Sequence, residues 1–481
     1  MSEEQGSGHG LKKELGLRDL VPMQILLVVG VTWCGIAAKQ GGTQLWFWVV
    51  GILFFFLPLA RLVTYCVQVW PQEGGVYQWT KHAIGPWAGF LSAWNFAFWV
   101  LLVVSNLGIL TATSLSYSLG DKYAWMATSN WFILLLSFVL FGIILLVNLP
   151  GFSIGKWVSH FGTTVMLLVT GLLMVLLFWH PHDSPAHPQV IQQSRFSLAI
   201  ALHGNFSMMA MLFTINLFSK VAFNSLSGLE QVAVFAGETR NAAKTILRSA
   251  WVAAPVIAIM YILMTGSILT YIPSDKVDLT GPIPQILAAA FSGGGATTGT
   301  DWGLMLGRGA ILALALACIA QYAVVVAEIS RLPMVVGWDG LLPPIFTKLH
   351  PKWKTPVWSI TTMVVLAFVA CLVALFLGNS NQVAFQLIVT VANLCGGVYY
   401  VLFFAVPLVV GDRFGQKPSI GVKLCAISCM SVALIAMGFM MQPIVPVKNV
   451  WVFAFEVFFI SIVANVVGLL MYFNGSKKSN A

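Results

Sequence analysis

Twelve apolar runs follow one another along this chain, and only short hydrophilic gaps separate them. A helix of roughly 20 apolar residues crosses the hydrocarbon of a bilayer. The chain is 58% hydrophobic and only 9% charged. In soluble domains roughly a quarter of the residues are charged. The runs therefore predict an all-α polytopic membrane protein with 12 transmembrane helices, near residues 21–38, 45–69, 85–113, 131–149, 156–179, 206–236, 248–272, 304–332, 357–377, 383–410, 421–441 and 450–473.

The sixth run carries polar side chains that a lipid-facing helix would not. Asn216, Lys220 and Asn224 recur at every fourth position, which places them on one helical face, and Glu230 follows soon after. Ionisable groups inside a membrane are costly, so they face protein or water. The small residues between these charges predict a helix that breaks near Ser225–Gly228 and exposes backbone groups to a ligand.

The first run is interrupted as well, by Gly30, Thr32 and Gly35. Glycine there either lets a ligand approach the backbone or allows close helix packing. The first and sixth runs each begin a block of five helices, and interrupted segments at matching positions point to a transporter's binding site. The predicted layout has an N-terminal tail, a five-helix repeat, an outer loop, a second five-helix repeat, two further helices and a C-terminal tail: 1–20, 21–179, 180–205, 206–410, 411–473 and 474–481. A second outer loop is expected at 273–303.

Other ionisable residues lie within the predicted spans. Arg61 either snorkels, pairs internally or belongs to an inner gate. His160 either makes a structural hydrogen bond or carries protons. Glu328 lies three positions before Arg331, which favours an ion pair near the cytoplasmic end, with a coupling role as the alternative.

Polar residues at helical spacing mark three more spans as candidates for lining a cavity, although packing against neighbouring helices explains them as well. The third span carries Asn95 and Trp99, the eighth carries Gln321, and the tenth carries the stripe Gln386, Thr390, Asn393, Gly397 and Tyr400.

Charge and cysteine patterns exclude other classes of protein. With the N-terminus in the cytoplasm, about 17 of the 25 Lys and Arg residues fall on cytoplasmic segments and about 6 on outer ones, which is the positive-inside pattern. The net charge of +9 is thus a topology signal, and we expect no nucleic-acid partner. The seven cysteines lie in apolar runs without paired spacing, so we expect no disulfide framework, no metal site and no cofactor. Because no nucleophile or metal cluster is apparent, we do not expect an enzyme.

Three segments resemble hallmarks of the amino acid–polyamine–organocation (APC) superfamily, and they occur in the expected order. They are EGGVYQWTKHAIGPWAGFLSAW (73–94), SGLEQVAVFAGETRN (227–241) and SRLPMVVGWDGLLPPIFTKLHPKWKTP (330–356). Residues 37–60 look most like the glutamate/γ-aminobutyrate antiporter branch. The resemblance implies a 5+5 inverted-repeat core with discontinuous helices 1 and 6, two trailing helices, and an amino acid or amine substrate. Lys220 departs from the family pattern, which leaves ion coupling and substrate open.

This resemblance suggests a mechanism based on the two breaks. Free N–H groups at the first break would hold a carboxylate, and carbonyls at the second would hold an ammonium group. The expected substrate-binding residues are Gly30, Val31, Thr32, Trp33, Cys34, Asn95, Trp99, Lys220, Asn224, Ser225, Leu226, Ser227, Gln321 and Asn393. The coupling or gating candidates are Lys220, Glu230, Arg61, His160 and Glu328.

Lys220 has three possible roles at this stage. It replaces a coupling cation, anchors an acidic group of the substrate, or pairs with Glu230.

The sequence thus predicts a secondary active transporter of an amino acid or amine in the plasma (inner) membrane, with both termini cytoplasmic. Transport would proceed by exchange or proton coupling, so protons join the substrate and the lipid bilayer as expected partners. The alternative is a sensor of the same fold that binds its ligand without moving it. The oligomeric state is left open.

Overall fold

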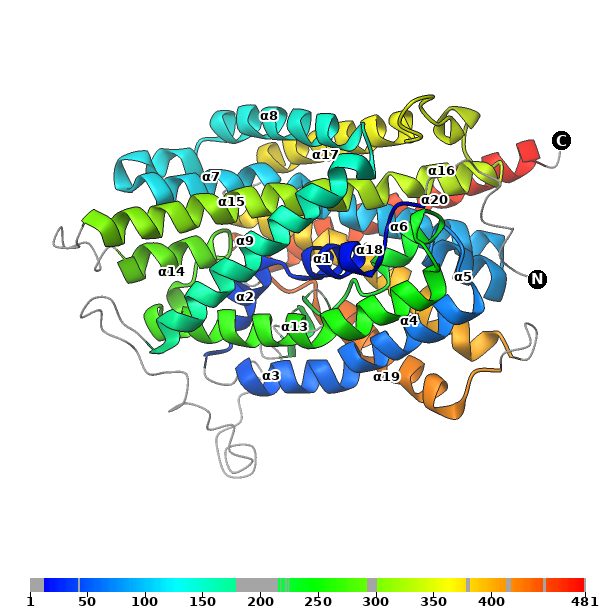
Figure 1. The fold of residues 1–481 in the computed structure, drawn as a ribbon, viewed down its shortest axis with the longest axis horizontal. Coiled ribbons are helices and arrows are strands. Elements are labelled where there is room, and N and C mark those ends of the chain that lie inside the picture. Colours follow the sequence, from blue (N-terminus) through cyan, green and yellow to red (C-terminus); the bar gives the residue numbers. More distant parts are fainter. Residues whose placement is uncertain are drawn as a thin grey trace.

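The apolar runs form helices because a segment inside hydrocarbon has to satisfy its own backbone N–H and C=O groups. The computed structural model describes residues 13–41, 44–178, 215–216, 218–220, 223, 225–291, 301–377, 381–411, 417–443 and 447–479. In these ranges the chain forms no β-strand, only one isolated bridge between Leu15 and Thr239. The described chain begins and ends at the same end of the helix bundle, which we call the terminal end (Figure 1). The all-α fold is confirmed.

The first half of the bundle follows the predicted spans closely. It comprises α1 (Leu17–Val28), α2 (Val31–Ala38), α3 (Gln44–Gly51), the π-helix η2 (Ile52–Phe56), α4 (Leu57–Val69), the short α5 (Val76–Ala83), α6 (Pro86–Ser105), α7 (Leu107–Leu119), the 3₁₀ turn η3 (Asp121–Ala127), α8 (Asn130–Asn148) and α9 (Phe152–Phe178).

The second half contains the 3₁₀ segment η4 (Gln231–Glu238), α13 (Ala242–Tyr271), η5 (Ser274–Lys276), α14 (Pro282–Phe291), α15 (Asp301–Ile329), α16 (Arg331–Trp338), η7 (Pro344–Thr347), α17 (Val357–Leu377), α18 (Asn381–Val409), α19 (Ile420–Phe439) and α20 (Val450–Ser479). Ten helices in the described part are long and apolar enough to cross a membrane, and α1 with α2 adds one broken span. The first part of the predicted sixth span (206–214, with 217, 221, 222 and 224) and the outer loop 180–205 lie outside the described residues.

The loop expected at 273–303 is wrong in part, because α14 forms within it. This helix packs against α2, α7, α13 and α15. Its contact with α2 is close: a Cβ added to Gly35 would lie 2.8 Å from the ring of Pro282. Sequence reasoning missed α14 because ten apolar residues are too few to span a bilayer, so hydropathy does not separate such a helix from a loop.

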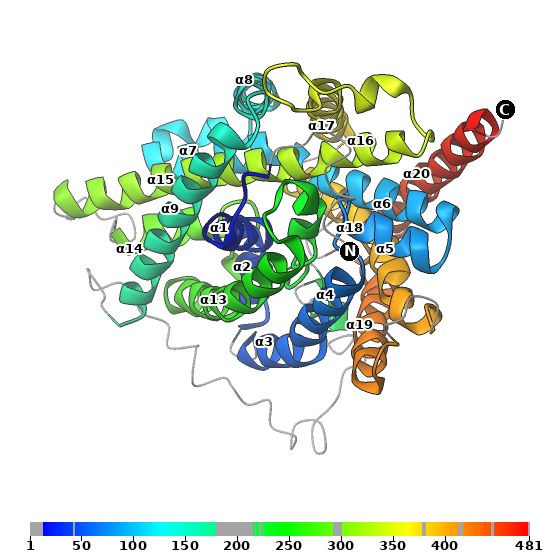
Figure 2. The ribbon, with the colours of Figure 1, turned by 45° about the vertical axis from the view of Figure 1, so that its right-hand side comes forward.

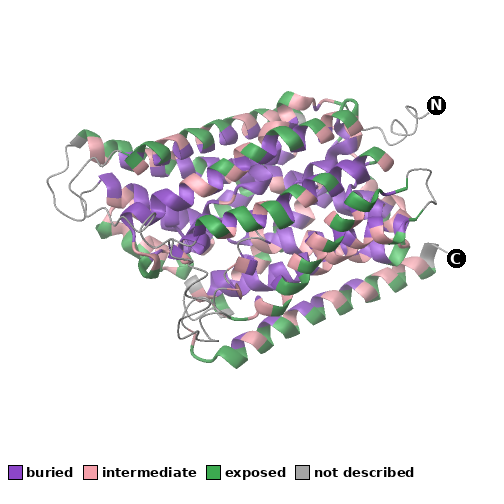
Figure 3. Cartoon of the chain, turned by 90° about the horizontal axis from the view of Figure 1, so that it is seen from below, coloured by how far each residue is buried: buried purple, intermediate pink, exposed green. Residues whose placement is uncertain are grey.

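Burial separates the central helices from the outer ones (Figure 3). In their most apolar windows, α18 is 83% and the α6–α7 span 78% buried inside the protein, whereas α8, α19 and α20 are each 28% buried. Figure 2 shows α8 beside α17 on one side of the bundle and α4 beside α19 on another, with α1 between them. The outer helices therefore present apolar side chains to lipid, and the interrupted α1 and α2 lie inside the protein.

Candidate functional site

The first span is broken between α1 and α2, as predicted. The two helices are bent by 41°. Val29 (φ −77°, ψ 102°) and Gly30 (φ −105°, ψ 118°) are extended between them. A Cβ at Gly30 would lie 2.5 Å from the indole ring of Trp33, so only glycine lets the first turn of α2 fold back over this break.

Side chains from other helices satisfy the backbone groups that the first break frees. The hydroxyl of Tyr261, on α13, accepts a hydrogen bond from the Gly30 N–H (3.0 Å) and donates one to the Val28 carbonyl (2.6 Å). The side-chain amide of Gln321, on α15, donates to the carbonyls of Val29 (2.7 Å) and Leu26. Gln321, a predicted pocket residue, therefore binds the break itself.

The second break lies where the sequence predicts it. Helical structure ends at Ser225, Leu226–Glu230 form an irregular turn, and η4 continues from Gln231. Gly228 has φ +105°, a conformation that glycine tolerates and other residues do not.

Two tyrosines of α18 stabilise this turn. The hydroxyl of Tyr400 accepts from the Gly228 N–H (3.0 Å) and donates to Oε1 of Glu230 (2.6 Å). Tyr399 donates to the same oxygen at 3.3 Å. Tyr400 therefore connects the backbone of the second break to a buried carboxyl group.

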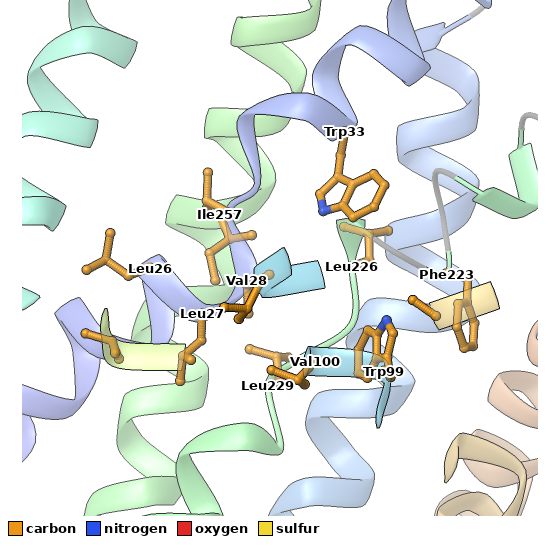
Figure 4. Packing of buried hydrophobic residues seen from close by; sticks show 14 of the residues in the cluster. Leu26, Leu27, Val28, Trp33, Trp99, Val100, Phe223, Leu226, Leu229 and Ile257 are labelled. Carbon is orange, nitrogen blue, oxygen red and sulfur yellow. The ribbon is translucent and has the colours of Figure 1, made fainter. Parts of the chain in front are cut away.

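The two breaks adjoin each other. Gln24 of α1 donates to the Leu229 carbonyl at 2.7 Å, and a Cβ on Gly228 would lie 3.3 Å from the side chain of Val28. Figure 4 shows Trp33 of α2, Leu226 of the second break and Trp99 of α6 near one another around the two interruptions. Backbone at two interruptions of the membrane helices thus meets at one place in the bundle.

Trp99 and α18 border this junction. The indole of Trp99 lies edge-on to the ring of Tyr400, with centroids 5.8 Å apart, and against Gly396. Its Nε1, and both side-chain polar atoms of Asn393, are buried without a hydrogen-bond partner in the described part of the chain. Buried polar atoms are normally paired, so these groups mark a place where a ligand or water would complete the bonding.

Other predicted site residues face elsewhere. Asn95 donates to Asn465 of α20 at 2.8 Å. Lys220 donates to the Gln442 carbonyl at 2.5 Å, and Asn216 donates to the same carbonyl at 3.2 Å. Asn224 lies outside the described residues.

The coupling candidates fall into distinct settings. Arg61 is exposed on α4, and His160 of α9 lies 3.2 Å from Asp19 of α1. Glu328 of α15 is fully buried, and neither of its carboxyl oxygens has a hydrogen-bond partner in the described ranges. Glu230 is fully buried as well, and its Oε1 accepts from Tyr399 and Tyr400.

The expected ion pair between Glu328 and Arg331 is wrong, because Arg331 pairs with Glu238 instead. The guanidinium makes two bonds to that carboxylate, Nε to Oε2 at 3.1 Å and Nη2 to Oε1 at 3.2 Å. A second carboxyl group, that of Glu73, is buried beside the pair and accepts from the Gly237 N–H. This charged cluster joins α16, η4 and the segment before α5.

The N-terminal segment is attached beside this cluster. Leu15, which is fully buried, pairs with Thr239 as a short parallel bridge, and the N–H groups of Glu14 and Leu15 both donate to the Glu238 carbonyl at 3.0 Å. The Arg240 N–H donates back to the Leu15 carbonyl at 2.9 Å. The first described residues thus pack at the terminal end of the bundle, against the end of η4, the segment that follows the second break.

Residues 15–471 match the amino acid permease family. The chain belongs to this family. It is 25% identical over 473 residues to an uncharacterized transporter of Legionella pneumophila, covering 93% of this chain and 94% of that protein. It is 24% identical to the low-affinity putrescine importer PlaP of Escherichia coli (74% and 72% covered) and 24% identical to the branched-chain amino acid permease BcaP of Bacillus subtilis (73% and 74% covered).

Membership confirms the resemblance to the APC superfamily. The protein is a multi-pass membrane transporter of amino acids or amines and not an enzyme. Sequence reasoning missed three residues that hold the two breaks, namely Gln24, Tyr261 and Tyr399. Their signal was a single polar or phenolic side chain within an apolar span, which hydropathy averages away.

Proposed function

We propose that this permease carries an amino acid or a related amine across the plasma membrane by alternating access, with both termini in the cytoplasm. The observation that carries the proposal is the junction of the two broken spans. Irregular backbone at membrane depth is tolerated only where protein buries it or a cavity adjoins it, and in transporters it binds substrate. The two five-helix repeats, 21–179 and 206–410, would each contribute one break.

The substrate would bind mainly to backbone. The N–H groups of the first turn of α2, beginning with Val31 and Thr32, lie at the positive end of the helix dipole, which suits a carboxylate, whereas the Trp33 N–H already donates to the Gly30 carbonyl at 3.1 Å. Carbonyls of Ser225, Leu226 and Ser227 would receive the ammonium group. Trp99 and Asn393 would line the side-chain pocket, and the unpartnered atoms of both support this assignment.

Proton coupling would use Glu230 and Glu328. Both carboxyl groups are fully buried, and in the described residues neither forms an ion pair, so ionising either one would leave a buried charge uncompensated. Movement of α18 would change the contact between Tyr400 and Glu230, and with it the affinity of the pair for a proton. Exchange without protons is the competing form of transport.

Counterflow in proteoliposomes tests the proposal. Vesicles preloaded with an unlabelled amino acid or diamine should accumulate the labelled compound, with candidates first ranked by thermal shift. Gly30→Ala should abolish counterflow because its Cβ meets Trp33, whereas Gly142→Ala should not, since nothing lies within 4 Å of a Cβ there. Thermal shifts without any counterflow would show a sensor and contradict transport.

A further inference from the structure

A second feature is an apolar pocket of about 280 Å³ near the terminal end of the bundle. Four parts of the chain form its wall: α6 between Phe90 and Leu101, α16 with the turn and η7 after it, α17 and α20. Trp94, Phe98, Leu332 and Val336 are among the lining residues. The polar side-chain groups of the lining are the hydroxyl of Thr362 and the indole N–H of Trp94, which donates to the Ala464 carbonyl at 2.8 Å.

The pocket opens on the lipid-facing surface. Leu366 is 45% and Met471 is 37% exposed, while deeper lining residues such as Phe90 and Leu332 are each 3% exposed. These exposed residues belong to α17 and α20, which both qualify as membrane spans. What meets this opening is therefore hydrocarbon, and an apolar hollow facing hydrocarbon fills with acyl chain.

The dimensions suit one chain of one leaflet. The lining residues of α6 run from Phe90 to Leu101, and 11 steps of 1.5 Å give a length of about 16 Å. Half of a hydrocarbon core of about 30 Å is about 15 Å. The pocket thus extends across one leaflet, the one at the terminal end.

From these observations we infer that one acyl chain of a membrane phospholipid occupies this pocket. The acyl chain packs against Leu332 and Val336 of α16, the helix that begins with Arg331. This packing therefore supports the ion pair between Arg331 and Glu238. The site is separate from the substrate site, and its test does not depend on transport.

Native mass spectrometry of the full-length protein tests the inference. Protein extracted from vesicles of phosphatidylglycerol and phosphatidylcholine should retain one phospholipid per chain after detergent exchange. Ala97→Trp fills the pocket and should lower the retained fraction at least about tenfold, a change of about 1.4 kcal/mol in binding free energy. Ala258→Trp, at a half-buried position of α13 that does not line the pocket, is the matched control and should retain the lipid.

Met471→Trp blocks the opening from an exposed position and should also lose the lipid, even if Ala97→Trp does not fold. Unchanged retention in a folded Ala97→Trp or Met471→Trp protein would overturn the inference. A retained mass that matches no phospholipid, such as a peptide or detergent, would overturn it as well.

Discussion

Replacing Arg331 by methionine removes the cation from a cluster that holds two buried carboxyl groups. The guanidinium is 2% and the Glu238 carboxylate 9% exposed, so solvent screens their attraction little. Removing one partner of a buried ion pair costs about 3–5 kcal/mol because the remaining charge is left uncompensated. Here the carboxyl group of Glu73 is buried in the same cluster, so we expect Arg331→Met to fall at the upper end of that range.

Glu238→Gln should cost less, because its guanidinium partner keeps bonds to the Ala327 carbonyl (2.7 Å) and the Ser330 hydroxyl (3.2 Å). The double variant, Arg331→Met with Glu238→Gln, leaves neither charge of the pair. Since a buried pair replaced as a whole is often close to neutral, we expect it to be more stable than the sum of the single changes implies, by at least about 2 kcal/mol.

The assay is the free energy of unfolding in mixed micelles for the wild type, both single variants and the double variant. Arg308→Met is the matched control, because it removes an exposed arginine from α15 and should change stability by no more than about 0.5 kcal/mol. Additive single effects, with a coupling below about 0.5 kcal/mol, would refute the view that the pair acts as a buried clamp.

Four further changes test the site. Gln321→Leu leaves two buried carbonyls of the first break without a donor and should lower the free energy of unfolding by about 1–3 kcal/mol, with loss of substrate-induced thermal shift. Tyr400→Phe should change the pH dependence of uptake more than Tyr399→Phe, whose contact with the shared carboxyl group is longer (2.6 against 3.3 Å); equal effects would argue against a coupling role. Burial, and after it the charge of a neighbouring carboxylate, raises the pKa of Glu73. The stability that the protonated Glu73 carboxyl group contributes is therefore complete below its ordinary pKa near 4.5 and is lost as the pH rises. Glu73→Gln should therefore lose less stability than the wild type between pH 5 and pH 8 in thermal unfolding. Lys220→Met should keep the pH response of exchange while losing stability, because the ammonium group donates to a backbone carbonyl. An altered pH response would instead show that Lys220 is a coupling group.

The spans and both breaks can be predicted from the sequence because each follows from the free-energy cost of placing particular residues of one segment in hydrocarbon. Hydrocarbon fixes the length of an apolar run, and charge or glycine inside such a run marks the place where regular helix ends. Gly30 and Gly228 show this directly: one lies against Trp33 and the other has a positive φ, and both requirements are visible as glycine in the chain.

Contacts between side chains of different helices cannot be predicted from the sequence in this way. Asn95 and Trp99 are four residues apart on α6, yet the first bonds to α20 and the second borders the junction. Helical spacing places both on one broad face, but the packing of neighbouring helices decides what each side chain meets. Lys220 illustrates the same limit, since its partner lies in a loop 222 residues further along the chain.

The residues that hold the breaks narrow the region where substrate binds. Tyr261 already bonds the Gly30 N–H and the Val28 carbonyl, and Gln321 bonds the two nearby carbonyls, so these groups of α1 are not free for a ligand. What remains is the start of α2 on one side and the carbonyls before Gly228 on the other. The supporting side chains fix the two breaks in position, and we assign the two ends of the substrate to the start of α2 and to the carbonyls before Gly228.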